Sequence, residues 1–354
     1  MIDNKKSFNN NSSIVFDNND KSIKEYLEKF SFTNTKHVLT QDEELSMRKL
    51  FLNKIEHFDI IQELSRGAYK KTIQLRNPKT SESLAVKIVE LNKLTGRAKK
   101  HLMMVGYKNV HDAFEDEARR MKQLNNLRNT HLSKIQGSGL NEGKSLYFFL
   151  EDYSERTLMD YVIENHPLSI KLIENIIYQL ADGLSAIHKY YCHGDLKLDN
   201  ILFRNCLMCI TDFGLAASMP DAESSTKNLI PHAQIRAPET FHNLKIDKRC
   251  DIWAFGINSY YISHKKWPFP LDYNGNILEW RNLSINERKK YELNVLKYIN
   301  NNDHYINILN NIEKFFRPKI SSILKQCLNR EPNKRFQDGF ELLNMLRTEK
   351  SLVK

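Results

Sequence analysis

The feature that most limits the fold of this chain is a change of sequence pattern partway along its 354 residues. Between residues 59 and 90 the runs DIIQEL, KKTIQLRN and LAVKIVE alternate apolar and polar residues, which predicts consecutive strands. Beyond residue 153 the apolar residues recur at helical spacing, most clearly over 169–191. A strand-rich first half followed by a helix-rich second half predicts an α+β protein with two lobes.

Composition is that of an ordinary globular protein, with 41% hydrophobic and 27% charged residues. The longest apolar stretches, such as LYFFL at 146–150, have the length of a strand, so no membrane span is expected. The N-terminal MIDNKKSFNNNSS lacks the apolar core of a secretory signal, and five cysteines do not suggest a disulfide framework. These features favour a cytoplasmic setting, which would be the host cytosol if the protein is a secreted effector.

The formal net charge is +10, which an anionic partner could exploit. The positive charges are dispersed along the chain, and their short clusters carry neither interleaved aromatics nor a nucleic-acid fold signature. We therefore expect no nucleic-acid partner. Nothing in the sequence indicates an oligomeric state.

Polar residues suited to phosphoryl transfer stand at short spacing in CHGDLKLDNILF, residues 192–203. That reaction needs a carboxylate for the hydroxyl proton, positive charge near the phosphates and oxygen ligands for Mg²⁺. Asp195 would act as the base, and Lys197 would stabilise charge on the transferred phosphoryl group. Asn200 and Asp212, the latter in ITDFG, would hold the metal.

The order of these motifs resembles that of eukaryotic-type protein kinases. HGDLKLDN stands where the family has H-R-D-L-K-x-x-N, and DFG is intact at 212–214. RAPE at 236–239 matches the A-P-E motif, and DIWAFG at 251–256 matches a structural brace of the family. The late Arg335 would form an ion pair with Glu239. The resemblance runs from about Asp59 to Arg347.

The resemblance implies the two-lobed kinase fold, with a β-rich N-lobe, a helical C-lobe and an ATP cleft between them. We expect an N-terminal extension over 1–54, the N-lobe with its hinge over 55–153 and the C-lobe over 154–350. The extension would combine a disordered tail with short helices, one of them starting at Thr40 with a capping box to Glu43.

The resemblance also implies the nucleotide site. Lys87 of LAVK would contact the phosphates of ATP and pair with Glu117 on the following helix. Leu150 would guard the back of the nucleotide pocket. The other expected contacts are the phosphate-covering residues Leu64, Ser65 and Gly67, together with Ala85, Leu202 and the hinge residues Glu151, Asp152 and Tyr153. The cofactors would be ATP and Mg²⁺, with Mn²⁺ as an alternative.

Two positions depart from the family pattern. The phosphate-covering loop LSRGAYKKT keeps only Gly67 of three glycines, and Lys70 at the third position is expected to point into solvent rather than to compensate with its charge. Gly194 replaces the Arg that, in the family, often binds a phosphate added to the activation segment. We therefore expect activity without activation-segment phosphorylation, although that segment contains Ser218, Ser224, Ser225 and Thr226.

The expected function is an ATP- and Mg²⁺-dependent serine/threonine kinase acting on a protein substrate. The His-Gly-Asp form also occurs in small-molecule kinases that resemble aminoglycoside and choline phosphotransferases, which is the first alternative. A-P-E, the glycine of DFG and Lys197 favour a protein substrate over these. A catalytically inactive scaffold is the second alternative, supported by the degenerate loop. Insertions at 92–109 and 271–315 are candidate sites for a regulatory partner.

Overall fold

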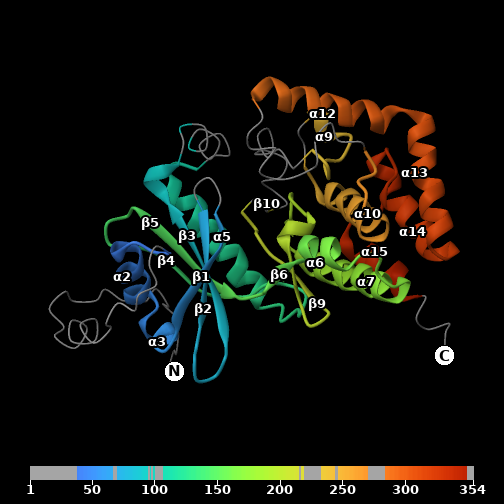
Figure 1. The fold of residues 1–354 in the computed structure, drawn as a ribbon. Coiled ribbons are helices and arrows are strands. Elements are labelled where there is room, and N and C mark those ends of the chain that lie inside the picture. Colours follow the sequence, from blue (N-terminus) through green and yellow to red (C-terminus); the bar gives the residue numbers. More distant parts are fainter. Residues whose placement is uncertain are drawn as a thin grey trace, which may run out of the picture.

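A computed structural model of the chain describes residues 38–66, 70–94, 96, 99, 107–214, 217–218, 233–243, 246–269 and 284–348. The expected N-terminal tail, most of the 92–109 insertion and residues 271–283 lie outside this part of the chain. A sheet with its covering helices forms one lobe and a helical assembly forms the other, so the predicted two-lobed α+β architecture is confirmed (Figure 1). Over the described ranges, no helix has the length and apolar character needed to cross a bilayer.

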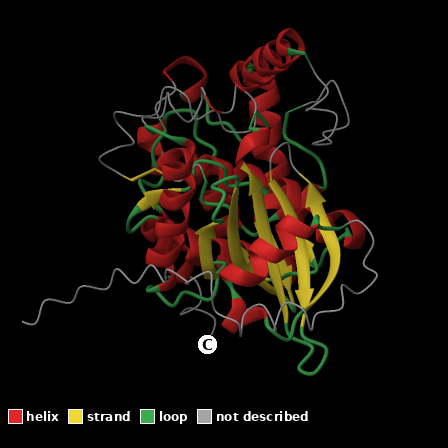
Figure 2. Cartoon of the chain, turned by 90° about the vertical axis from the view of Figure 1, so that its left-hand side faces the viewer, coloured by secondary structure: helices red, strands yellow, loops and turns green. Residues whose placement is uncertain are grey.

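The N-terminal lobe follows the strand pattern of the sequence. Its elements are α2 (Gln41–Leu50), α3 (Leu52–Ile55), β1 (Asp59–Arg66), β2 (Lys70–Arg76), β3 (Ser83–Glu90), the 3₁₀ turn η1 (Leu91–Lys93), α5 (Val110–Asn125), β4 (Ile135–Leu140) and β5 (Leu146–Asp152). The five strands form an antiparallel sheet in the order β1-β2-β3-β5-β4. Figure 2 shows the twisted sheet with helices packed against it.

The N-terminal helices are part of this lobe. Helix α2 starts after Thr40 with the expected capping box, in which the Glu43 carboxylate accepts from the Thr40 amide at 2.8 Å. Met47, Phe51 and Ile55 pack on one face of the sheet in a cluster that includes Val86, Ile88, Phe148 and Leu150. Glu43 also forms a buried ion pair with Lys71 of β2 at 2.7 Å. The extension therefore anchors β2, because separating two buried charges leaves each of them desolvated.

Strand β4 was not anticipated, because its sequence IQGSGL contains two glycines that weaken a strand pattern. The glycines make room for the N-terminal helices. A Cβ atom at Gly137 would lie 2.9 Å from the Phe51 ring, and one at Gly139 would lie 2.7 Å from Leu50. Close approach of α2 and its following turn therefore requires glycine on this edge strand.

The second lobe is mainly helical, as predicted. It contains β6 (Arg156–Thr157), α6 (Leu158–Asn165), α7 (Ile170–Ile187), β7 (Tyr191–Cys192), the 3₁₀ turn η2 (Leu198–Asn200), β8 (Ile201–Arg204), β9 (Leu207–Ile210), β10 (Ala217–Ser218), α9 (Thr240–Asn243), α10 (Lys248–His264), α12 (Ile285–Asn300), α13 (Asn302–Phe315), α14 (Pro318–Cys327), the 3₁₀ turn η4 (Pro332–Lys334) and α15 (Gly339–Arg347).

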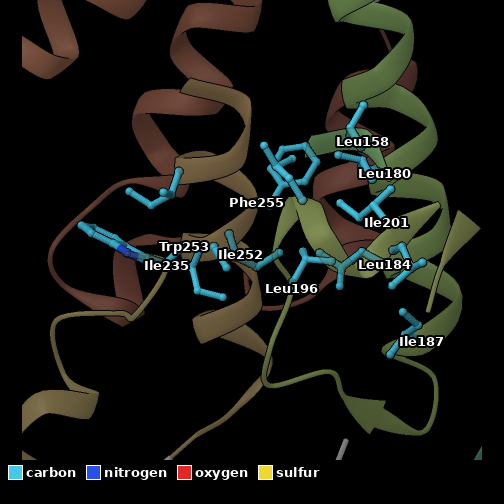
Figure 3. Close-up of a cluster of buried hydrophobic side chains, with 14 of the residues drawn as sticks. Leu158, Leu180, Leu184, Ile187, Leu196, Ile201, Ile235, Ile252, Trp253 and Phe255 are labelled. Carbon is cyan, nitrogen blue, oxygen red and sulfur yellow. The ribbon is translucent and has the colours of Figure 1, made fainter. Parts of the chain in front are cut away.

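The core of this lobe holds the loop that carries Asp195. Figure 3 shows Leu196 of that loop among apolar side chains from α7 and α10, including Leu184 and Ile252. Leu196 and Leu198 are fully buried, so two residues of the polar motif are fixed by packing. The Leu196 carbonyl also accepts a hydrogen bond from the buried Asn258 amide on α10 at 2.7 Å. The apolar positions of the motif therefore set the backbone from which its polar side chains project.

The predicted ion pair between Glu239 and Arg335 is confirmed. Two parallel hydrogen bonds of 2.8 Å join the guanidinium to the carboxylate. The Arg335 side chain is fully buried, lies over the Trp253 ring and donates to the carbonyls of Asn329 and Arg249. A buried guanidinium with this many partners stabilises the end of the A-P-E segment against α10 and the following loops.

Candidate functional site

Asp195 lies in the loop between β7 and η2 and is held by two neighbours in the motif. Its carboxylate Oδ2 is 3.0 Å from Lys197 Nζ and accepts a 3.0 Å hydrogen bond from Asn200 Nδ2. The same amide group donates to the Asp195 carbonyl at 3.0 Å. The side chain of Asp195 is 14% exposed, so the carboxylate is oriented by its partners and remains accessible. The structure thus brings together three of the predicted residues.

His193 is a structural residue. Its ring is fully buried, and its Nδ1 accepts from the Asp195 amide at 3.2 Å. Because Nδ1 accepts, Nε2 must carry the proton that is donated to the Thr211 carbonyl at 3.1 Å. One imidazole therefore links the backbone at Asp195 to the residue that precedes Asp212.

Asp251, the first residue of DIWAFG, braces the same loop from α10. Its carboxylate accepts from the backbone amides of His193 at 2.6 Å and Gly194 at 2.9 Å, and contacts His188 Nε2 at 3.0 Å. Burial alone would raise the pKa of Asp251, but His188, His193 and the Gly194 amide together hold it below its ordinary value. Gly194 has a φ of 78°, a left-handed conformation that glycine adopts readily. The backbone at position 194 therefore suits the glycine that stands where the family has Arg.

Asp212 occupies a strained backbone position with its side chain in a positive environment. Its φ of 66° lies in the left-handed region, which costs a non-glycine residue about 1 kcal/mol or more. Desolvation would raise the pKa of Asp212, but Lys70, Lys87 and Lys197 outweigh it and hold the pKa below its ordinary value. The carboxylate therefore remains ionised at neutral pH, and its side chain is 41% exposed.

The expected pairing of Lys87 with Glu117 is wrong. Both oxygens of the Glu117 carboxylate instead lie 3.1 and 3.2 Å from Lys70 Nζ. Lys70 Nζ is also 3.7 Å from Asp212 Oδ1, so this lysine does not point into solvent as expected. The reason is strand register. Lys70 and Thr72 lie opposite Val89 and Lys87, which places both lysines on the sheet face turned toward α5.

Lys87 pairs with Glu151 instead. Its Nζ lies 2.8 Å from Glu151 Oε2 and donates to Thr211 Oγ1 at 3.4 Å. Burial would lower the pKa of Lys87, but Glu151 and Asp212 prevail and raise it. The side chains of Lys87 and Glu151 are 16% and 2% exposed, so the ion pair is largely removed from water.

The same register corrects the expected role of Leu150. Ala85 lies opposite Glu151 and Val86 lies opposite Leu150, so these two pairs occupy opposite faces of the sheet. Leu150 packs toward the N-terminal helices. The Glu151 side chain, and not that of Leu150, lies on the face of the sheet that carries Lys87. Glu151 is also flanked by β3 and β4, so it belongs to the sheet rather than to a free hinge.

The remaining expected nucleotide contacts come from several elements. Ala85 is buried on the lysine face of β3, and Ser65 is exposed near the end of β1 with Leu64 beside it. Tyr153 follows the end of β5, and Leu202 is half-buried on β8. Gly67 lies outside the described residues, as do Ser224, Ser225 and Thr226 of the activation segment.

The donor atoms suit a hard cation bound together with phosphates. Asp212 contributes an ionised, partly exposed carboxylate. The amide nitrogen of Asn200 is engaged with Asp195, so its amide oxygen is the atom available to a cation. Magnesium typically takes one or two such protein oxygens and completes its shell with phosphate and water. Lys70 Nζ lies 3.7 Å from Asp212 Oδ1 and supplies positive charge there, which suits an anionic phosphate chain.

Comparison with known proteins supports this interpretation of the site. Residues 58–345 match the protein kinase domain. The chain is 26% identical over 213 residues to a probable serine/threonine-protein kinase of Clostridium acetobutylicum, covering 59% of this chain and 29% of the relative. It is 31% identical over 183 residues to a serine/threonine-protein kinase of Schizosaccharomyces pombe, covering 50% of this chain and 44% of the relative.

A probable serine/threonine-protein kinase of Dictyostelium discoideum is 26% identical over 212 residues, with 59% of this chain and 39% of the relative covered. The matched regions thus span less than half the length of each of these three curated relatives.

Asp251→Asn tests the brace under the catalytic loop. A carboxylate whose pKa is lowered by folding adds stability that is complete above its unfolded pKa of about 4 and is lost as the pH falls through the folded value. We expect the variant to lose about 3 kcal/mol of unfolding free energy at pH 7 and the difference from wild type to shrink below about pH 4. Urea unfolding of both proteins between pH 7 and pH 3.5 measures this difference in unfolding free energy.

The matched control is Asp247→Asn at the N-cap of the same helix, whose side chain accepts from the Arg249 amide. Asparagine caps helices as well as aspartate does, so a loss below about 1 kcal/mol is expected there. An Asp251→Asn difference that stayed constant or widened on acidification would contradict the charged role of this residue.

Proposed function

Because the chain belongs to the protein kinase family, we propose that it transfers the γ-phosphate of ATP to serine or threonine hydroxyls of proteins. The observation that carries the proposal is the geometry at Asp195, whose carboxylate is fixed by Lys197 and Asn200 and remains partly accessible. Catalysis of phosphoryl transfer depends on positioning and charge stabilisation rather than on covalent chemistry by the protein. A preoriented carboxylate beside an ammonium meets both requirements.

In this proposal Asp195 receives the proton of the substrate hydroxyl. The hydroxyl oxygen forms a bond to the γ-phosphorus, the bond from that phosphorus to the β,γ-bridging oxygen breaks, and ADP leaves with the electron pair. Lys197, 3.0 Å from Asp195, stabilises negative charge on the transferred group. Burial would lower the pKa of Lys197, but the neighbouring Asp195 carboxylate raises it and so favours the charged ammonium.

Asn200 and Asp212 would hold Mg²⁺, which when bound neutralises charge on the phosphate oxygens. The support for this assignment is the ionised state and exposure of Asp212 and the orientation of the Asn200 amide by Asp195. Strain at Asp212 is consistent with a functional position, because such backbone conformations persist where surrounding structure imposes them.

A protein substrate is favoured over a small molecule by the A-P-E segment. The bidentate pair of Glu239 and Arg335 anchors that segment to the helical lobe. Lys197 in HGDLKLDN matches the pattern of serine/threonine-specific kinases. The three relatives described above carry serine/threonine kinase names. These observations support a serine/threonine preference.

Activity independent of activation-segment phosphorylation is supported by position 194. Glycine there offers no guanidinium to a phosphate, and its amide is already bound to Asp251. We expect phosphatase-treated enzyme to retain its kcat within about twofold of untreated enzyme, with mass spectrometry confirming phosphate removal. Loss of turnover after dephosphorylation, restored on rephosphorylation, would contradict independence and leave the phosphotransfer chemistry intact.

Asp195→Asn tests the assigned base. Removing the proton acceptor is expected to lower kcat for phosphate transfer by about 10² or more, because general-base catalysis contributes about that factor. ATP affinity should change by less than about threefold, since this carboxylate faces the hydroxyl rather than the nucleotide. The assay follows ADP release with a basic protein, aminoglycosides and choline as alternative acceptors.

A kcat for Asp195→Asn within threefold of wild type would contradict the assigned base. Transfer to an aminoglycoside or choline, with none to protein, would contradict the proposed substrate class. Thermal unfolding of the variant at the wild-type temperature excludes misfolding as the cause of a lower rate.

A further inference from the structure

Lys70 and Lys87, the two lysines on the sheet face turned toward α5, form ion pairs with different carboxylates. Lys70 is bound to Glu117 of α5 and lies 3.7 Å from Asp212. Lys87 is bound to Glu151 of its neighbouring strand. Resting on the proposed function, we propose that Lys70, and not Lys87, is the lysine that contacts the phosphates of ATP.

Lys70 occupies the position that this contact requires. Its ammonium bridges the helix glutamate and the carboxylate assigned to the metal, so it lies where a metal-bound phosphate chain would carry its charge. The Lys70 side chain is 22% exposed, and its ammonium lies 5.4 Å from the centre of the Phe149 ring. Glu117 itself is 3% exposed, so it is a fixed, buried support for the lysine.

These groups lie close to Gly214 of the DFG motif. A Cβ atom at that position would lie 3.3 Å from Glu117 Oε2 and 3.5 Å from Asp212 Oδ1. The first distance would require a small shift of Glu117, whereas the second is an ordinary contact. Glycine therefore leaves room for the helix glutamate beside Asp212 and Lys70 without any shift.

Lys87 is committed elsewhere. To reach a phosphate it would have to leave Glu151, a carboxylate that is 2% exposed and whose Oε1 has no hydrogen-bond partner in the described part of the chain. Removing one member of a buried ion pair leaves the other charge desolvated and uncompensated. The Thr211 hydroxyl, 3.4 Å from both Lys87 Nζ and Glu151 Oε2, adds a further restraint on this pair. Lys87 therefore acts as a positioning residue for β5 and the segment before Asp212.

Comparing ATP with adenosine isolates the phosphate contact, because both ligands share the base and ribose. We expect Lys70→Met to weaken ATP binding by about 10- to 100-fold, the range expected when a hydrogen bond to a charged group is lost, and to leave adenosine binding unchanged. The matched control is Lys93→Met, which removes a 66% exposed lysine of the same lobe. Titration calorimetry with Mg²⁺ present measures each affinity, and thermal unfolding confirms each fold.

Each single replacement removes the lysine partner of a buried carboxylate, Glu117 in Lys70→Met and Glu151 in Lys87→Met, and is expected to lower the unfolding temperature. The informative variant is therefore the double replacement Lys87→Met with Glu151→Met, which removes both buried charges. Its ratio of ATP affinity to adenosine affinity should stay within about threefold of wild type. Lys70→Met should also lose turnover at subsaturating ATP.

A lower ratio of ATP affinity to adenosine affinity in the double variant would overturn the assignment to Lys70, whatever the ratio in Lys70→Met. An unchanged ratio in Lys70→Met would overturn it as well. Wild-type protein that neither binds ATP nor transfers phosphate would instead overturn the proposed function, and this inference with it.

Discussion

Charge neutralisation between two lysines and three carboxylates at the junction of the lobes is the constraint on which the candidate site depends. Lys70 with Glu117 joins β2 to α5, and Lys87 with Glu151 joins β3 to β5. Asp212, from the other lobe, is stabilised as an anion by both lysines. Because separation of a buried pair exposes each partner to an uncompensated desolvation cost, this network relates the position of the sheet to that of Asp212.

The helical lobe contributes a second, more rigid network around Asp195. Asp251 binds two backbone amides at the start of the loop, His193 connects the loop to Thr211, and buried leucines fix its middle. These contacts come from helix α10, from the loop itself and from Thr211, whose hydroxyl also lies 3.4 Å from Lys87 and Glu151 of the sheet. The proposed base is thus positioned mainly by the helical lobe, and Thr211 is the residue at which the two networks meet.

Much of this was predictable from sequence, and the errors have physical causes. The structure brings together Asp195, Lys197 and Asn200 as their close spacing in the sequence predicted. Strand β5 is buried on both faces and lacks a period of two, so the sequence could not show whether Leu150 or Glu151 faces the lysines. The side of the sheet reached by Lys70 depends on strand register, which only the paired structure reveals.

The proposed chemistry is tested most directly by transfer of labelled γ-phosphate from Mg-ATP, comparing wild type with Asp212→Ala. The account predicts label on serine or threonine of an added protein or of the enzyme itself, identified by phosphoamino-acid analysis. It also predicts that the label is lost in the variant, because the ionised Asp212 carboxylate is the proposed metal ligand of the site. Wild-type enzyme that binds ATP but transfers no phosphate, or equal transfer by Asp212→Ala, would contradict the account.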